Sequence, residues 1–259
     1  MNLRSVLGAA RRCLLAMHNE WPGFLSLSAP VVSFSFDDFP RSALWNGGAI
    51  LKANGICGTY YAAMGLIGAN MATGEQFHRG DLDALLQDGH ELASHTYSHV
   101  SSHKSTPQSY GEEVLRGQKA VEQITGRSGP QSFAYPFGHI AMGVRGEIAG
   151  KVSSARSVWG GLNGPWLDLS RLRACSIYGG REAFPALSVL IRRNANRKRW
   201  LIFYTHDVSR TPSRFGCTPE LFDMVVQLSL QCATMRTIGE VTATISSGRK
   251  TARNALLAS

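Results

Sequence analysis

The sequence predicts an α/β fold, a single distorted (β/α) barrel with seven or eight strands. Short apolar runs rich in β-branched and aromatic residues alternate with amphipathic segments along the chain, as in a parallel sheet covered by helices. The length of 259 residues is ordinary for such a barrel, and 44% hydrophobic residues suffice for a full core. No break in composition and no internal repeat divides the chain, so one domain is expected.

The expected strands are short apolar runs bounded by glycine, proline or polar residues. The run 31–36 reads as a buried strand and ends in two aspartates, and the run 200–204 is strongly β-prone. The full set of expected strands is 31–36, 58–63, 91–94, 132–135, 153–158, 172–177, 200–204 and 234–237. The carboxyl ends of barrel strands carry the chemistry, so residues that directly follow these strands are the candidates for a site.

The expected helices lie between these strands. Gly55 closes the first helix, and the longest has Pro107 in its first turn and Gly126 past its end, as helix boundaries commonly do. The full set of expected helices is 43–54, 81–87, 106–124, 141–149, 181–196, 218–231 and 238–245.

We predict that the domain occupies residues 31–245, with an N-terminal extension at 1–30 and a basic tail at 246–259. In the extension, apolar residues are interrupted by Arg11 and Arg12, too often for a secretory signal peptide or a membrane span. The five cysteines are scattered without a Cys-x-x-Cys pair, which indicates reduced thiols. We therefore expect a cytoplasmic protein, whose extension could also lie on a membrane surface as a short basic amphipathic helix.

The balance of charge is basic, with 27 lysines and arginines against 18 acidic residues and a net charge of +9. This charge either keeps the surface soluble or attracts an anionic partner, such as a membrane face, a phosphorylated lipid carrier or an acidic glycan. No basic helix interleaved with aromatic residues is present, so we do not expect binding to nucleic acid. Peripheral association with an anionic membrane surface is compatible with this composition, and the oligomeric state is left open.

Two aspartates and three histidines are the candidates for chemistry. Asp37 and Asp38 end the first strand, and His95 and His99 are four residues apart, so one helical turn would place both imidazoles on one side. Asp38 with the two histidines would form a two-His, one-carboxylate metal site with open positions for water and substrate. Asp37 would be the base for the water, and His206, at another strand end, the acid for an amine leaving group. Each residue alone also has a structural explanation, but the combination favours catalysis.

These motifs, in this order, resemble the polysaccharide deacetylases of carbohydrate esterase family four, the NodB-homology group. Ser35-Phe36-Asp37-Asp38 is similar to the family motif Thr-Phe-Asp-Asp, and His95-Thr96-Tyr97-Ser98-His99 fully matches His-Ser/Thr-x-x-His. The apolar run that ends in His206 is similar to the last family motif. The resemblance spans about residues 31–241 and implies the same barrel fold, the same base, the same ligands and the same acid.

A further motif, Ala134-Tyr135-Pro136-Phe137-Gly138, corresponds to the family loop Arg-x-Pro-Tyr-Gly. The resemblance implies that Tyr135, Pro136 and Phe137 line the substrate groove and that the Phe137 N–H faces the oxyanion. Ala134 stands where many members have an arginine that positions the catalytic aspartate, and we name Arg41 and Arg173 as candidates to replace that charge. The family aspartate that orients the catalytic histidine has no clear counterpart, although Asp168 and Asp207 are candidates.

The resemblance implies metal-dependent removal of N-acetyl groups from amino sugars of a glycan, a chitooligosaccharide or a lipid-linked polysaccharide precursor. The expected partner is thus a glycan or glycolipid. Zn²⁺ is the first expectation for the metal, and the same ligand set accepts Co²⁺, Ni²⁺ or Mn²⁺. Two alternatives stay open: hydrolysis of another linear amide, such as a formamido sugar or a ureide, and a catalytically inactive glycan-binding protein, suggested by Ala134 and by the missing orienting aspartate.

Overall fold

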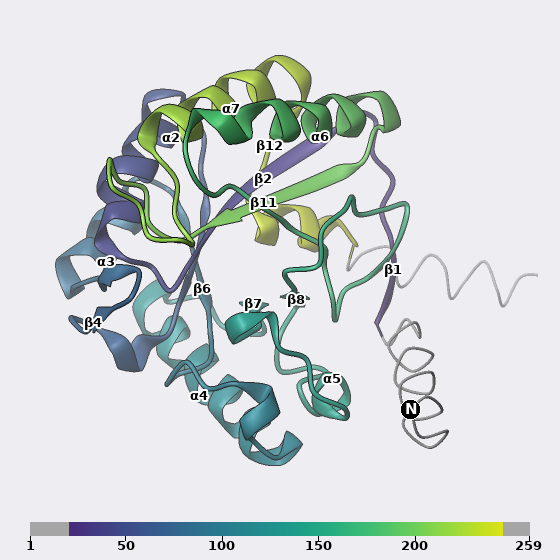
Figure 1. Ribbon diagram of the computed structural model, residues 1–259. Coiled ribbons are helices and arrows are strands. Elements are labelled where there is room, and N and C mark those ends of the chain that lie inside the picture. The colour runs from purple at the N-terminus through teal and green to yellow at the C-terminus, as the bar shows by residue number, and fades with distance from the viewer. Residues whose placement is uncertain (1–20, 246–259) are drawn as a thin grey trace, which may run out of the picture.

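A computed structural model describes residues 21–245, so most of the predicted extension and the whole predicted tail lie outside the described residues. Its centre is a curled parallel sheet (Figure 1). In spatial order the strands are β10 (Cys175–Ser176), β11 (Trp200–Thr205), β2 (Val31–Asp37), β3 (Thr59–Ala62), β6 (Glu91–Ser94), β7 (Ser132–Ala134) and β8 (Ser154–Arg156), with β12 (Thr234–Met235) also pairing with β2. A bridge between Arg156 and Leu172 joins β8 to the segment before β10. The predicted barrel of seven or eight strands is confirmed.

Helices cover the outside of this sheet, and α6 and α7 lie side by side across one part of it (Figure 1). They are α2 (Ala49–Ala53), which continues the π-helical turn η1 (Ala43–Gly48), then α3 (Arg79–Gln87), α4 (Pro107–Thr125), α5 (Val144–Glu147), α6 (Phe184–Arg197), α7 (Pro219–Cys232) and a helix at 238–245. In α4 the Thr106 side chain accepts from the Ser109 N–H at 3.2 Å, and Gly126 ends the helix with φ +66°. No helix within residues 21–245 is long and apolar enough to cross a bilayer.

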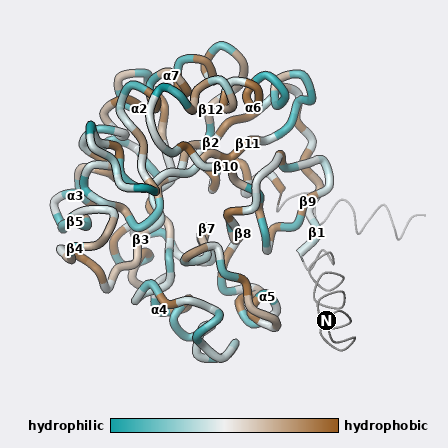
Figure 2. The backbone as a smooth tube through the Cα atoms, in the orientation of Figure 1, coloured by the Kyte–Doolittle hydropathy of each residue, from teal (hydrophilic) through white to brown (hydrophobic). Residues whose placement is uncertain are grey.

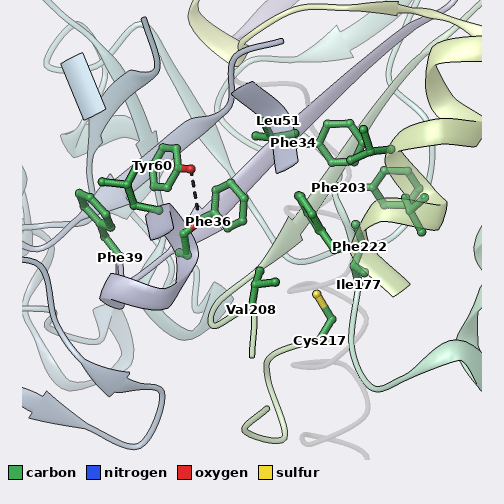
Figure 3. Packing of buried hydrophobic residues seen from close by; sticks show 14 of the residues in the cluster. Phe34, Phe36, Phe39, Leu51, Tyr60, Ile177, Phe203, Val208, Cys217 and Phe222 are labelled. Carbon is green, nitrogen blue, oxygen red and sulfur yellow. Dashed lines mark hydrogen bonds between the residues drawn. The ribbon is translucent and has the colours of Figure 1, made fainter. Parts of the chain in front are cut away.

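The two faces of β2 explain where the site can form. Phe34 and Phe36 point outward into the core between sheet and helices, where Phe34 meets Phe222 of α7 with ring centroids 5.5 Å apart (Figure 3). Side chains alternate along a strand, so Ser35 and Asp37 point into the barrel. Inward residues of other strands, Tyr61, Ile202 and Tyr204, belong to a second core cluster that also includes Tyr110 and Val114 of α4. Figure 2 shows hydrophobic colour along the central strands and more hydrophilic colour on the outer helices. Asp37 is therefore the inward residue at the end of a buried strand.

Two short antiparallel pairs lie outside the sequence expectations. β1 (Pro22–Phe24) pairs with β9 (Trp166–Asp168), and β4 (Asn70–Met71) pairs with β5 (Gly74–Glu75). Strands this short carry no detectable periodicity in the sequence. Trp21, directly before β1, is buried in the second core cluster. The domain boundary at residue 31 remains a prediction.

Candidate metal centre and catalytic residues

Asp38, His95 and His99 come together at the carboxyl edge of the sheet, each offering one ligand atom within 4.8 Å of the others. Asp38 directly follows β2 and His95 directly follows β6. Nε2 of His99 lies 3.0 Å from Oδ1 of Asp38, and Nε2 of His95 lies 3.6 Å from the same oxygen. The structure thus assembles the three residues that the sequence predicts as metal ligands.

The donor atoms fit a divalent cation. Oδ1 of Asp38 is buried, and within residues 21–245 no group donates to it with hydrogen-bond geometry. Nδ1 of His95 lies 2.8 Å from the Ala134 carbonyl oxygen, so Nδ1 carries the ring proton and Nε2 presents its lone pair to the site. Burial and the adjacent His99 lower the pKa of His95 to about 4. Burial would raise the pKa of Asp38, but the imidazoles of His99, His95 and His206 outweigh it and lower that pKa. An ionised carboxylate and a neutral imidazole are the forms that bind a metal.

Backbone strain is concentrated in the loops that carry these ligands. Among the described residues, the non-glycine residues with positive φ are Asp38, Phe39, Thr96, His99, Phe137 and Lys198. All except Lys198 belong to the three motif loops. Such conformations cost about 1–3 kcal/mol each and persist where the surrounding structure holds them. The segment 95–99 is therefore a strained bend, and the expectation that one helical turn brings the two imidazoles together is wrong.

Helix α4 supports the bend from outside. The Glu113 carbonyl oxygen accepts from the Tyr97 N–H at 3.2 Å, and its carboxylate accepts from the Ser98 N–H at 2.9 Å. A Cβ atom at Gly117 would lie 2.5 Å from Ser94 Oγ and 2.8 Å from the carbonyl carbon of Thr96. Glycine at 117 thus allows α4 to approach the bend closely enough to hold it.

Asp37, the candidate base, is paired with Arg156, which the sequence prediction missed. Nη2 of Arg156 donates to Oδ1 of Asp37, and both side chains are buried. Arg156 ends β8, its Nη1 donates to the Ser157 carbonyl oxygen at 3.0 Å, and its guanidinium lies 5.1 Å from the Tyr61 ring centroid and 4.9 Å from that of Tyr204. Burial would lower the pKa of Arg156, but the charge of Asp37 raises it. Arg156 therefore supplies the positive charge that Ala134 lacks.

The two arginines expected in this role lie elsewhere. Nε of Arg41 donates to Asp81 at 2.9 Å, and Arg41 also pairs with Glu75 at 3.5 Å. Nη1 of Arg173 donates to the Gly160 carbonyl oxygen at 3.0 Å. The expectation that Arg41 or Arg173 replaces the family arginine is corrected, because the curl of the sheet brings the end of β8 to Asp37 instead.

His206 directly follows β11 and is oriented by a backbone carbonyl. Nδ1 of His206 lies 3.1 Å from the Phe215 carbonyl oxygen. Since a carbonyl only accepts, Nδ1 donates and Nε2 is left to exchange a proton with the site. Asp207 stabilises the loop that connects His206 to Phe215. Its carboxylate accepts from the Ser213 N–H at 2.7 Å and from the Ser213 hydroxyl at 2.5 Å. Asp168 instead binds Arg145. The orienting group is thus part of the backbone, which no residue type in the sequence reveals.

Of the three residues expected to line the groove, Phe137 is the one with an exposed side chain. Its ring centroid lies 4.6 Å from that of His99. Tyr135 and Pro136 are buried, and the Tyr135 hydroxyl donates to the Ser170 carbonyl oxygen at 3.0 Å. Ala134 lies opposite Arg156 and is the inward residue here, whereas the Phe133 ring lies 6.4 Å from that of Tyr110 in α4. Tyr135, two residues after Phe133, points to the same outer side, so its side chain supports the loop rather than the groove surface.

Part of this chain is similar to a known protein family. Residues 26–149 match the family model described as polysaccharide deacetylase, a segment that includes Asp37, Asp38, His95, His99 and Phe137. Among curated proteins, none matches the chain significantly.

Solved structures extend the similarity of fold beyond that segment. The Xyl-CE4 domain of a multidomain xylanase from the hindgut metagenome of Trinervitermes trinervoides is 17% identical, with 84% of this chain and 91% of that chain covered and a TM-score of 0.55. The peptidoglycan deacetylase PdaC from Bacillus subtilis is 18% identical, with 90% and 98% covered and a TM-score of 0.50. IcaB from Ammonifex degensii is 17% identical, with 60% and 70% covered and a TM-score of 0.53. At these identities, the likeness is one of fold.

Proposed function

Because residues 26–149 belong to the polysaccharide deacetylase family, as the motifs predicted, we propose that the chain is a metal-dependent hydrolase of the N-acetyl amides of amino sugars. Its substrate is a glycan, a chitooligosaccharide or a lipid-linked polysaccharide precursor. The observation that carries the proposal is the convergence of Asp38, His95 and His99 beside the buried pair of Asp37 and Arg156.

Asp38, His95 and His99 would hold the metal, with Zn²⁺ as first choice and Co²⁺, Ni²⁺ or Mn²⁺ accepted by the same donors. When bound, such a cation polarises the amide carbonyl and lowers the pKa of water. The exposed Phe137 ring lies 4.6 Å from that of His99, so the three ligand residues lie next to a surface that a substrate can reach from solvent.

Asp37 is the general base of the proposed reaction. Arg156 holds Oδ1 of its carboxylate, which leaves Oδ2 to take a proton from the attacking water. The oxygen of that water adds to the amide carbonyl carbon, and the Phe137 N–H donates to the oxyanion that develops. The left-handed backbone of Phe137, with φ +60°, determines where this N–H points.

His206 is the general acid. Its Nδ1 is held by the Phe215 carbonyl, so protonated Nε2 can donate to the nitrogen of the leaving amine as the C–N bond breaks. The products are acetate and an amino sugar with a free amine. Two departures suggested an inactive glycan-binding protein, and a contact in the structure stands against each: Arg156 pairs with Asp37 in place of the arginine missing at position 134, and the Phe215 carbonyl takes the place of the missing orienting aspartate.

The test is acetate release from N-acetylglucosamine oligomers and lipid-linked glycans, by metal-stripped protein with Zn²⁺ or Co²⁺ restored. We expect release that requires the metal and falls by about 10²–10⁴-fold in Asp37→Asn. Asp83→Asn is the matched control, because Asp83 is an exposed residue of α3, and its activity should equal that of the unchanged protein.

Absence of acetate from every glycan while the metal stays bound would contradict deacetylation. Formate from a formamido sugar, or hydrolysis of a ureide, with the same dependence on Asp37 would then assign the site to another linear amide.

A further inference from the structure

Six cationic side chains gather at the edge of the barrel opposite the catalytic residues. They come from the end of α6, the turn into β11 and the residue after β12, and we call them the basic edge: Arg192, Arg193, Arg197, Lys198, Arg199 and Arg236. From residue 183 to residue 206 the chain contains no aspartate or glutamate. Among the described helices and strands, this stretch therefore has the largest excess of positive over negative side chains.

Backbone hydrogen bonds bring these residues together. The Val31 N–H donates to the Arg199 carbonyl oxygen at 2.9 Å, and the Arg236 N–H donates to the Val32 carbonyl oxygen at 3.2 Å. Arg199 and Arg236 thus lie on the two sides of the start of β2, where neighbouring strands are about 4.8 Å apart. Nδ2 of Asn194 donates to the Val31 carbonyl oxygen at 3.0 Å, which holds the end of α6 at the same place.

The charge of the basic edge is not used within the described structure. Five of its side chains are exposed, and Arg199 is half-buried. The ion pairs found within residues 21–245 include none of the six, whereas Arg41, Arg145 and Arg156 each bind a carboxylate. Unpaired exposed cations repel one another, so their gathering favours an external anionic partner.

The same exposed face of α6 is apolar at its other end. Pro185, Ala186 and Val189 are exposed, Val189 by 63%, and the spacing of 3 and 4 residues from Val189 places Arg192 and Arg193 on the same face. In Figure 2 the end of α6 that leads into β11 is hydrophilic. A helix face that combines apolar and cationic residues without acids is typical of contact with an anionic membrane surface.

We propose that the basic edge docks this protein on an anionic lipid bilayer. The exposed apolar residues of α6 favour a bilayer over a nucleic acid, since only the bilayer offers both phosphates and an apolar layer. Docking leaves the site accessible, because β11 begins beside the basic edge at Trp200 and ends beside His206 about 17 Å away. With the outer face of α6 on the bilayer, the catalytic edge lies beside the docked face and stays open to the glycan.

Co-sedimentation with vesicles tests the proposal without any measurement of hydrolysis, so its outcome is separate from that of the proposed activity. The full-length protein should bind vesicles of phosphatidylcholine with phosphatidylglycerol and should not bind phosphatidylcholine alone. The variant Arg193→Gln/Arg197→Gln should partition about 30-fold more weakly, since each cation near such a surface contributes roughly 1 kcal/mol. The control Lys119→Gln/Arg127→Gln removes the same charge from exposed positions in α4 and just after it, and should bind as the unchanged protein does.

Three results would overturn the proposal. Equal binding to both kinds of vesicle would remove the role of lipid charge. Equal losses in the two double variants would show that net charge alone drives binding. Tighter binding to a DNA duplex than to the anionic vesicles, with the same dependence on Arg193 and Arg197, would replace the bilayer by a nucleic acid. Circular dichroism spectra and melting temperatures identical among the variants would establish that they fold.

Discussion

Arginine has opposite surroundings at the two edges of the barrel. At the catalytic edge Arg156 is fully buried and binds Asp37, whereas at the basic edge Arg193 and Arg197 are exposed and belong to no ion pair found within residues 21–245. Breaking a buried pair leaves an uncompensated charge and costs about 3–5 kcal/mol, whereas an exposed charge contributes about 0–1 kcal/mol. The catalytic edge should therefore depend on single residues, and the basic edge on the sum of many.

The largest expected effect comes from Arg156→Met. The substitution leaves the charge of Asp37 buried without a partner, so the free energy of unfolding should fall by about 3–5 kcal/mol, and hydrolysis should be lost with it. Arg193→Met, at the opposite edge, should change that free energy by less than about 0.5 kcal/mol. Urea unfolding of the two variants measures how much each arginine contributes to the free energy of unfolding.

The double variant Arg156→Met/Asp37→Asn sharpens this test. With both charges removed, most of the lost stability should return while hydrolysis stays absent, because the base is gone. A double variant no more stable than Arg156→Met would show that packing around Arg156, rather than its charge, supports the catalytic edge.

A smaller effect is expected from Ser213→Ala, which leaves the site residues themselves unchanged. The substitution removes the hydrogen bond from the Ser213 hydroxyl to Asp207 and the one that this hydroxyl accepts from the Phe215 N–H, which loosens the loop that presents the Phe215 carbonyl to His206. We expect kcat to fall about 10–100-fold with KM and metal affinity unchanged, because only the position of the acid is disturbed. Ser209→Ala, in the same loop but without contact to Asp207, is the control. A fall in kcat shared by both variants would mean that the loop as a whole, and not this contact, matters.

The smallest effect concerns His90, which lies just before β6 at the edge that holds the strand starts. Nδ1 of His90 accepts from the Gly58 N–H at 3.1 Å, so a proton on Nδ1 would break this bond, and burial lowers the pKa of His90. The unfolded chain then binds more protons in mild acid, so this contribution to stability is present above about pH 6.5 and is lost as the pH falls further.

The variant His90→Asn checks this sign. Its side-chain oxygen can accept from Gly58 at any pH, so the loss of about 1 kcal/mol for that hydrogen bond in acid should disappear. Unfolding measured from neutral to acidic pH, with activity at neutral pH unchanged, gives the comparison. If the stability of His90→Asn falls with acidification as steeply as that of the unchanged protein, groups other than His90 cause the loss.

Local pattern was enough to predict much of this protein. The alternation in 31–37 indicates a strand whose outward phenylalanines pack against helices and whose last residues reach the rim, and β2 confirms it. The ligand residues Asp38, His95 and His99 could be named because each follows a predicted strand closely, and parallel strands all end at one edge. These properties depend on residues near one another in the chain.

The remaining features depend on positions far apart in the chain. Arg156 stands 119 residues from Asp37 and meets it only because the sheet curls from β2 around to β8. The group that orients His206 is a main-chain oxygen, which every residue possesses, so no residue type identifies it. The basic edge joins α6 to Arg236 through the pairing of β11 and β12 with β2. Sequence by itself determined the strands and the ligand types, whereas tertiary structure decided which charges are paired, because burial and strand order are properties of the whole fold.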